Sequence, residues 1–243
     1  MSLLPLRVAV VCWSNQNQSM ETHSILSKRG FSVQSFGIAR HVKLPGPAPN
    51  KPNIYDSETT YDEMYNDLIT KDKEFYTQNG VLCMLDRNKR IKLRPERFQD
   101  CKDVFDLIIT CEERIYDQVV EDLNSREQDT CHPVHVVNMD IQDNQEDAIV
   151  GAFLICELCQ CIQRSEDMEN EIDQLLQKLE KKSDQAFLHT VCFYYWSWPG
   201  ARCCHCRLLL LPLPPWPASP LLLSRLPPLP LQPSRSHRVE LTF

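Results

Sequence analysis

The sequence has little of what marks a secreted, membrane-spanning or nucleic-acid-binding chain. Its 26 basic side chains are outnumbered by 33 acidic ones, which argues against broad contact with a nucleic-acid backbone. No basic leader precedes the first apolar run, so we expect no signal peptide. Ten of the 17 prolines interrupt the apolar C-terminal segment, so it is not expected to form a membrane helix of about 20 residues.

The cysteines lack the arrangement of a disulfide framework or a metal site, although the chain has 12 of them. Without a signal peptide we expect reduced thiols and a nuclear or cytosolic location. Cys156, Cys159 and Cys161 lie in one apolar, helix-like stretch, where packing is favoured over a redox or metal role because no second pair has ligand spacing. "CCHC" at 203–206 is too closely spaced for the usual zinc geometry. We predict neither a metal nor a cofactor.

Composition changes abruptly near Tyr194. Residues 1–194 hold 21 basic and 32 acidic side chains, whereas 195–243 hold five arginines and one acid. We therefore predict two parts, an acidic domain over 1–194 and a Pro/Leu-rich, irregular and disordered tail over 195–243. The tail composition is also typical of polyproline-II recognition segments.

The first residues have the pattern of a β-α-β unit. The β-branched run at 6–12 suits a buried parallel strand. A helix is expected at 19–30, with Gly30 ending it, and the alternating segment 31–37 predicts a second strand. In open α/β sheets the loop after the first strand of such a unit is a usual ligand site.

Strands and helices are expected to alternate through the rest of the domain. The four prolines of 41–56 predict an ordered loop or lid, and 81–85 with 90–94 predict a small β-hairpin insertion. Further strands are expected at 104–111 and 132–139, and helices at 61–80 (with Met64, Leu68 and Phe75 on its apolar stripe), 112–123, 146–163 and around 172–179. The predicted fold is a doubly wound α/β domain with a mainly four-stranded parallel sheet flanked by helices.

Cys12 ends the first predicted strand, and a polar loop leads from it to a helix. Loop amides and the helix dipole favour an anion there. The same field lowers the pKa of a thiol, which would make Cys12 a usable nucleophile. Ser19 is placed to donate a hydrogen bond to the sulfur. The alternative is an ordinary capped helix after a strand that ends in a buried cysteine, and spacing alone leaves both open.

Many separate segments resemble one family, the cysteine-based RNA polymerase II C-terminal-domain phosphatases. They include "ILSKRGFSV", "HVKLPGPAP", "YTQNG", "MLDRNKRIK", "RPERF", "YDQVVEDLNSRE", "DIQDN" and "FLHTVCFY". The resemblance covers the acidic domain and none of the tail. It implies a fold similar to low-molecular-weight tyrosine phosphatases and removal of phosphate from the fifth-position serine of the polymerase heptad, with the next proline in the cis form. It also implies work with the scaffold protein symplekin in mRNA 3′-end processing and transcription termination in the nucleus, without a metal.

The resemblance assigns roles to individual residues. Cys12 matches the nucleophile that forms a cysteinyl-phosphate, and Asp143 matches the general acid for the leaving serine oxygen. From spacing alone Asp140, Asp143 and Asp147 are equivalent candidates, and a turn or N-cap role for Asp143 is open. Lys43 and Pro45 are expected to border the peptide groove. The phosphate-binding loop comprises Trp13, Ser14, Asn15, Gln16, Asn17, Gln18 and Ser19.

Two loop positions depart from the family pattern. Gln18 stands where the family has an arginine, and Trp13 where it has a small serine. A guanidinium grips two phosphate oxygens in the transition state, whereas glutamine brings one NH₂ donor and no charge. The thiolate also loses a neighbouring cation, so its pKa should rise. Trp13 adds bulk at the tight turn. Both changes predict a folded relative with weakened catalysis.

Three functions follow from these observations. The first is a phosphatase of phosphoserine–proline repeats, and the second is a non-enzymatic module that still holds phospho-repeats or symplekin. The third is the product of a duplicated gene with little function, which the Pro/Leu-rich extension favours. The first two require no direct contact with nucleic acid or membrane.

Overall fold

The computed structural model describes residues 5–48, 50–126, 132–165 and 167–194, and every prediction made for the tail lies outside this part of the chain. Its elements follow the order β1 (Arg7–Cys12), α1 (Gln18–Lys28), β2 (Ser32–Gly37), β3 (His41–Ala48), β4 (Lys51–Asp56), α2 (Tyr61–Gln78), α3 (Val81–Ile91), a 3₁₀ turn (Phe98–Asp100), β5 (Leu107–Thr110), α4 (Glu113–Ser125), β6 (His132–Asn138), α5 (Gln145–Arg164), α6 (Met168–Ser183) and β7 (Leu188–Tyr194).

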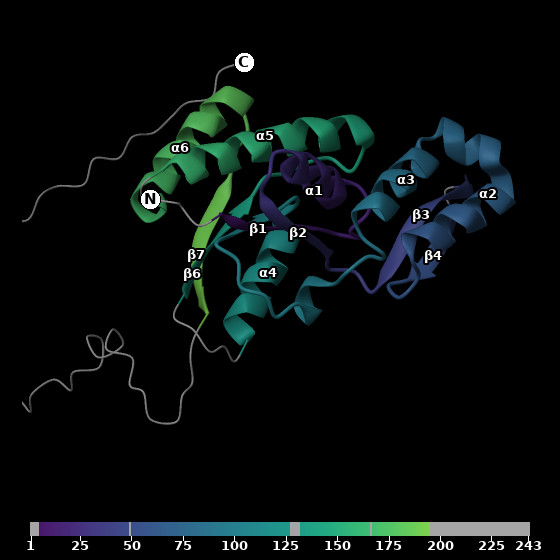
Figure 1. The fold of residues 1–243 in the computed structure, drawn as a ribbon, viewed down its shortest axis with the longest axis horizontal. Coiled ribbons are helices and arrows are strands. Elements are labelled where there is room, and N and C mark those ends of the chain that lie inside the picture. Colours follow the sequence, from purple (N-terminus) through teal and green to yellow (C-terminus); the bar gives the residue numbers. More distant parts are fainter. Residues whose placement is uncertain (1–4, 49, 127–131, 166, 195–243) are drawn as a thin grey trace, which may run out of the picture. The chain divides into compact units, whose positions relative to one another are not determined.

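The main sheet has the strand order β2-β1-β5-β6-β7. In Figure 1, α5 and α6 lie above this sheet and α4 lies below it. The four predicted strands pair in parallel, which confirms the doubly wound α/β fold. The fifth strand, β7, was not predicted. It pairs antiparallel with β6, with His132 opposite Tyr194. The residues Val191 to Tyr194 are all apolar, so the sequence hides the alternation by which Cys192 and Tyr194 are buried while Val191 and Phe193 are exposed.

Two hydrophobic clusters sandwich the sheet, because successive side chains of a strand point to opposite faces. In β1, Val8, Val10 and Cys12 pack into the cluster that includes α1, α5 and α6. Ala9 and Val11 pack into the other cluster, which includes α4 and β7. Cys156 and Cys159 are buried in the first cluster, as their predicted packing role requires.

The predicted loop over 41–56 is wrong, because this segment forms an antiparallel hairpin of β3 and β4. Proline is excluded from central strands because it cannot donate to the ladder. Both strands of a two-stranded sheet are edges, and the pairing also shifts between Leu44 and Ala48, so the prolines are tolerated. Val42 and Leu44 alternate with exposed residues and are buried.

The predicted hairpin over 81–94 is also wrong, because residues 81–91 form the helix α3. Its buried residues Val81, Leu82, Met84, Leu85 and Asn88 follow helical spacing. The polar "DRNK" segment, which resembles a turn, belongs to the last two turns of this helix. Helix α3 packs with α2 and the β3–β4 hairpin around a third hydrophobic cluster.

Helix α2 occupies the predicted segment and ends at Gln78. Met64 and Leu68 are buried as predicted, but Phe75 is 37 % exposed and Tyr76 is buried in its place. The backbone at Asp72 is non-helical, with φ −164° and ψ 90°. This kink shifts the phase of the apolar stripe by one residue.

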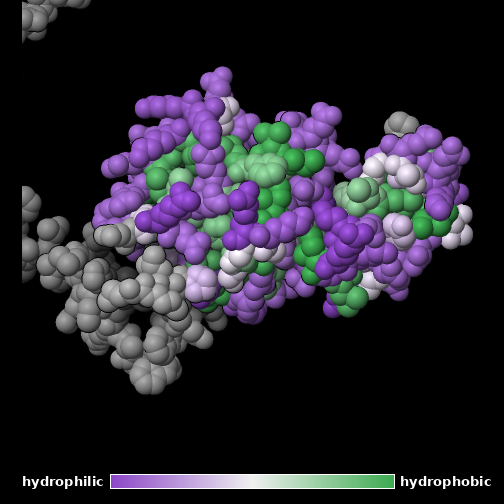
Figure 2. All heavy atoms as spheres, turned by 45° about the horizontal axis from the view of Figure 1, so that its top comes forward, coloured by the Kyte–Doolittle hydropathy of each residue, from purple (hydrophilic) through white to green (hydrophobic). Residues whose placement is uncertain are grey.

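Helix α5 confirms the strongly apolar helix expected at 146–163. Its inner side is buried in the first hydrophobic cluster, and its outer side still exposes Ile149, Val150 and Phe153. The face drawn in Figure 2 is mostly hydrophilic, with hydrophobic residues gathered in a patch near its centre. In the described part of the chain, every helix is too short or too polar to cross a membrane.

Candidate functional site

The loop between β1 and α1 lies at the carboxyl edge of the parallel strands. Cys12 is the last residue of β1, and helix α1 begins at Gln18. The segment after β6 reaches the same edge, since β5 pairs with both β1 and β6 in parallel. The topology therefore brings the Cys12 loop and the "DIQDN" segment, which the resemblance assigned to one site, to the same edge of the sheet.

The Cys12 thiol is buried, with 1 % of the residue's surface exposed. Its sulfur lies 3.0 Å from Ser19 Oγ. Asn15 Nδ2 donates to the same Ser19 oxygen at 2.9 Å. The Ser19 hydroxyl can still donate its proton to the sulfur, or accept from the Cys12 thiol through its second lone pair. Burial nevertheless raises the pKa of Cys12, and this outweighs the lowering by the hydrogen bonds from Ser19 and the Asn15 amide. The direction is opposite to that expected from the loop field alone and agrees with the rise expected at Gln18, but burial is its largest cause.

Asn15 fixes the middle of the loop. It is fully buried and has φ +55°, a left-handed conformation that asparagine tolerates better than most residues. The Tyr61 hydroxyl donates to the Asn15 carbonyl at 2.5 Å, and Asn15 Oδ1 accepts from the Glu96 amide at 3.1 Å. Gly37, at the end of β2, lets the loop approach, because a Cβ there would lie 2.9 Å from the Asn15 amide nitrogen.

Gln16 is held by its backbone and not by its side chain. Its carbonyl accepts from Asn88 Nδ2 at 2.8 Å and from Arg87 Nη2 at 2.9 Å. The buried side-chain amide has no hydrogen-bond partner for either its oxygen or its nitrogen among the described residues. Buried polar atoms are rarely left in this state. The Gln16 amide is therefore a buried group of the loop whose donor and acceptor are both unpaired among the described residues.

Gln18 is directed away from the loop. Its side chain is buried, and Nε2 donates to the Ile141 carbonyl at 2.7 Å. Its single NH₂ group thus joins α1 to the segment after β6. Where the resembling family has a guanidinium that grips phosphate, this chain has a structural hydrogen bond.

Asp143 is the member of the predicted acidic trio that contacts the Cys12 loop. Its Oδ1 accepts a hydrogen bond from Asn17 Nδ2 at 3.0 Å. Asp140 accepts from the Glu113 backbone amide at 3.1 Å. Asp147 lies in the first turn of α5, 2.6 Å from the N-cap side chain. Geometry therefore separates three aspartates that spacing left equivalent.

A groove of about 590 Å³ adjoins the loop. Its lining includes Gln16 and Asn17 from the loop, Asp143, and the predicted peptide-groove residues Lys43 and Pro45 from β3. The hairpin that the sequence patterns missed is thus the element that carries one wall of the groove. The groove is lined mainly by polar side chains, with Leu44, Pro45, Val81 and Met84 as its apolar part, and its volume suits a small ligand or a short piece of peptide.

The Trp13 indole points out of the loop, with 38 % of the residue's surface exposed. The guanidinium carbon of Arg114 lies 4.6 Å from the centroid of the Trp13 ring, a cation–π distance. The Trp13 carbonyl accepts from the amides of Ile38 and Ala39, at 3.0 and 2.9 Å. Trp13 therefore fits in the loop while its carbonyl keeps both backbone hydrogen bonds. No sequence pattern predicted that its ring would stack on Arg114.

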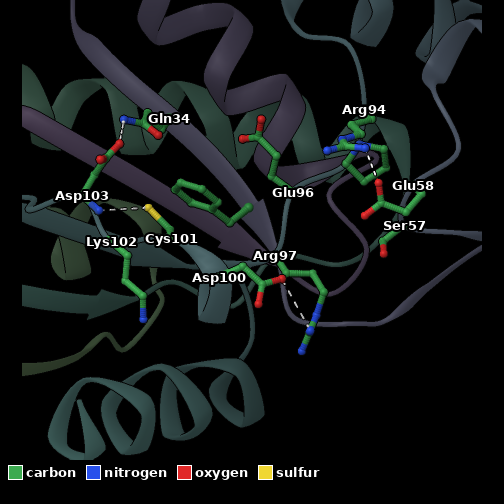
Figure 3. Close-up of a pocket in the computed structure, with 12 residues that line it drawn as sticks. Gln34, Ser57, Glu58, Arg94, Glu96, Arg97, Asp100, Cys101, Lys102 and Asp103 are labelled. Atoms are coloured by element: carbon green, nitrogen blue, oxygen red, sulfur yellow. Dashed lines mark hydrogen bonds and ion pairs between the residues drawn. The ribbon is translucent and has the colours of Figure 1, made fainter. Parts of the chain in front are cut away.

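A separate pocket of about 390 Å³ lies on the Glu96–Asp103 segment (Figure 3). Arg94 pairs there with Glu58, and Arg97 lies 3.6 Å from Asp100. The lining includes none of the predicted site residues. We assign the candidate site to the Cys12 loop and the groove that adjoins it at Gln16 and Asn17 instead.

A buried thiol at the end of a parallel strand, backbone amides of Asn15 and Ser19 that donate to it, and a carboxylate tied to the same loop make this edge of an α/β sheet the candidate site. Comparison with known sequences gives the family. The chain belongs to the Ssu72-like protein family, whose model matches residues 6–194.

Relatives cover the same part of the chain. It is 80 % identical over 190 residues to the RNA polymerase II C-terminal domain phosphatase SSU72 of Rattus norvegicus and of Homo sapiens, covering 78 % of this chain and 98 % of each relative. It is 65 % identical over 189 residues to the human SSU72 like protein 4, covering 78 % and 97 %.

Solved structures agree with the fold. A Drosophila melanogaster serine phosphatase of the RNA polymerase II CTD, of the SSU72 superfamily, has TM-score 0.76 and 54 % identity, over 78 % of this chain and all of that one. Drosophila Ssu72 with symplekin has TM-score 0.75 and 52 % identity, over 78 % and 98 %. In that structure it is bound to a cis peptidomimetic of the CTD with the fifth-position serine phosphorylated.

Proposed function

We propose that this chain is a cysteine-based protein-serine phosphatase of the phosphoserine–proline units in the RNA polymerase II C-terminal repeats. Its 80 % identity to CTD phosphatases supports this activity. The observation that carries the proposal is the 3.0 Å hydrogen bond from Asn17 to Asp143. This bond ties an acid to the loop of the nucleophile, and the reaction needs both groups at one phosphate.

In the first step the Cys12 thiolate attacks phosphorus. The S–P bond forms as the bond from phosphorus to the serine oxygen breaks, and Asp143 gives its proton to that oxygen. An alkoxide is a poor leaving group, so the acid contributes about 10²- to 10⁴-fold. Backbone donors of the loop and the Gln16 amide stabilise the phosphate oxygens.

In the second step water attacks the cysteinyl-phosphate. Asp143, now a carboxylate, takes a proton from the water as the oxygen–phosphorus bond forms. The S–P bond breaks and returns Cys12 as a thiolate, which the Ser19 hydroxyl stabilises from 3.0 Å. Phosphate leaves through the groove beside Lys43. Both steps use only groups of this chain, the substrate and water.

The same geometry supports weakened turnover. Gln18 carries no charge and its NH₂ group is engaged by the Ile141 carbonyl. Loss of one transition-state donor costs roughly 3–4 kcal/mol, or about 10²- to 10³-fold in rate. The raised pKa of Cys12 adds to this loss, since less thiolate is present at neutral pH.

The partners follow from the relatives. Drosophila Ssu72 is seen with symplekin and a mimic of the phosphorylated CTD. The groove here has Lys43, Pro45 and Asp143 on its walls, which supports binding of such a peptide by this chain. We assign it symplekin as a partner and the nucleus as its place of action, with the 3′-end cleavage and polyadenylation machinery.

A second function, a phosphopeptide-binding module without turnover, is favoured by one observation. The loop has its backbone supports from Tyr61 and Asn88 while Gln18 is turned away. Such a loop can hold an anion without the cation that speeds the reaction.

Phosphate release from a synthetic heptad peptide phosphorylated on its fifth-position serine tests the first function. We expect slow release by the full chain and none by Cys12→Ser. Calorimetry with the phosphorylated and unphosphorylated peptides tests the second. Equal, phosphate-dependent binding by wild type and Cys12→Ser, with no release by either, would establish the module and reject the enzyme.

A further inference from the structure

The groove beside the Cys12 loop meets a second pocket at Asp143. This carboxylate lines the groove and also lines a pocket of about 430 Å³ between the loop and the start of α4. Ser14 lines the groove, and Trp13, the residue before it, lines the second pocket. Two consecutive loop residues and one carboxylate therefore join the two pockets. A peptide whose phosphate lies at the loop can continue from the groove into the second pocket.

The indole of Trp13 is the large aromatic surface of this second pocket, and 38 % of the residue is exposed. The guanidinium of Arg114 covers one face of the ring, at 4.6 Å from its centroid. Arg114 Nε in turn donates to Glu112 at 2.7 Å, so the guanidinium is itself held in place. The indole is thus braced on one face and still contributes exposed surface to the lining.

Three carboxylates of this lining already accept hydrogen bonds. Glu112 accepts from Arg114 at 2.7 Å, Asp140 accepts from a backbone amide at 3.1 Å, and Asp143 accepts from Asn17 at 3.0 Å. An anionic side chain that entered the pocket would be repelled by these groups. A neutral aromatic ring can stack on the indole, and aromatic pairs gain more than the burial of their area provides.

We propose that Trp13 is a specificity-determining residue, which selects phosphopeptides with an aromatic side chain beside the phosphoserine, on the side that leads away from the Lys43 groove. The substrate ring stacks on the indole while the phosphate occupies the Cys12 loop. Arg114 is a positioning residue, because it braces the indole from the other face. The inference rests on the proposed function, since it requires that the loop bind phosphoserine.

Calorimetry on the Cys12→Ser variant of the full chain tests the proposal, because turnover cannot disturb the measurement. The probes are phosphoserine–proline peptides that are otherwise glycine, with phenylalanine or leucine directly before the phosphoserine. A second pair carries the same two residues directly after the proline. In one of the two pairs we expect phenylalanine to bind roughly 2- to 12-fold more tightly than leucine, since one side of the phosphoserine leads to Trp13.

Substitutions at Trp13 in the Cys12→Ser chain identify the source of this preference. Trp13→Ser removes the ring and should bind the phenylalanine and leucine peptides equally, whereas Trp13→Phe keeps a ring and should keep a preference. Phe75→Ser is the matched control, because Phe75 is 37 % exposed and belongs to the lining of neither pocket. The ratio of two affinities is the readout, since a general loosening of the loop would weaken both peptides alike.

Equal affinities for phenylalanine and leucine in both pairs would overturn this proposal and leave the proposed function standing. A preference that survives Trp13→Ser would do the same. So would tighter binding of a peptide with lysine in place of the phenylalanine, because the carboxylates and not the ring would then select the substrate. If none of the phosphorylated peptides binds, the proposed function is rejected and this proposal with it. The peptide comparison needs no Trp13 variant, so it decides the question even if Trp13→Ser fails to fold.

Discussion

The loop after β1 contains two supporting positions, which hold it in the protein, and two variant positions, where it departs from the family pattern. At the supporting positions, Asn15 and Gln16 receive hydrogen bonds from α2 and α3 on their carbonyls. At the variant positions, Trp13 stacks on Arg114 and Gln18 donates to the Ile141 carbonyl. The supports of the loop are in place, whereas the charge that would grip phosphate is missing from position 18.

From this difference we infer, as part of the proposed function, that the shape of the anion site and its catalytic power depend on different residues. The shape of the loop depends on buried side-chain donors from α2 and α3. The Gln18 side chain takes no part in these hydrogen bonds, because it donates to the Ile141 carbonyl. Catalytic power depends on groups aimed at charge that develops in the transition state. A chain can therefore keep its loop intact while it loses rate.

Asp143→Asn gives the largest change expected after loss of the nucleophile. The amide keeps the size of the carboxyl but supplies no proton to the serine oxygen, so single-turnover phosphate release should fall about 10²- to 10⁴-fold. Asp147→Asn is the control, since the hydrogen bonds of Asp147 are to the α5 N-cap, Asn144. Equal losses in the two variants would show that Asp143 is not the acid.

Gln18→Arg tests whether the variant positions limit the rate. Restoring a charged, two-pronged donor should raise kcat/KM on the phosphorylated heptad peptide by about 10²- to 10³-fold. Gln18→Lys supplies charge without the fork and should recover only part of this gain. An arginine variant no faster than wild type would mean that the missing cation is not what limits the reaction.

The pH dependence of the reaction sharpens the same comparison. With p-nitrophenyl phosphate the leaving group needs no acid, so the rate follows the thiolate alone. Because burial raises the pKa of Cys12 above its ordinary value, kcat/KM on this substrate should rise about tenfold per pH unit from pH 6 to 8 and continue to rise into the alkaline range.

Gln18→Arg should move that profile to lower pH, since a nearby cation favours the thiolate. Gln18→Glu is the matched control, because an added negative charge should move the profile the other way. A wild-type profile that is flat from pH 6 to 8 would contradict a raised pKa of Cys12.

Much of this architecture was predictable because it follows from local patterns. The strand–loop–helix layout placed Cys12 and Ser19, and the structure puts their side chains 3.0 Å apart. The β3–β4 hairpin and α3 were predicted wrongly, because prolines and polar runs usually mark breaks. An edge strand tolerates prolines, and the exposed side of a helix is normally polar.

The details of the site depend on contacts between distant segments, which no local pattern contains. Gln18 and Ile141 are 123 positions apart in the chain, and Trp13 meets Arg114 only once α4 has packed on the sheet. The unpaired amide of Gln16 is likewise a property of its surroundings. Residue type and spacing predicted which residues form the site, but not where their donors point.

Tyr61→Phe tests the supporting positions directly and should have the smallest effect. It removes the donor to the Asn15 carbonyl, a 2.5 Å bond in a buried setting, and leaves that oxygen unpaired. We expect a loss of about 1–3 kcal/mol in the free energy of unfolding, measured in urea.

Tyr65→Phe is the control for this substitution. The Tyr65 ring contacts Lys89 at 4.1 Å, a contact that phenylalanine keeps, so stability should change by less than about 0.5 kcal/mol. If Tyr61→Phe is as stable as wild type, the Asn15 carbonyl needs no donor from α2. The loop would then be held by its contacts with α3 and β2. The hydrogen bond from α2 to Asn15 would not be needed to hold it.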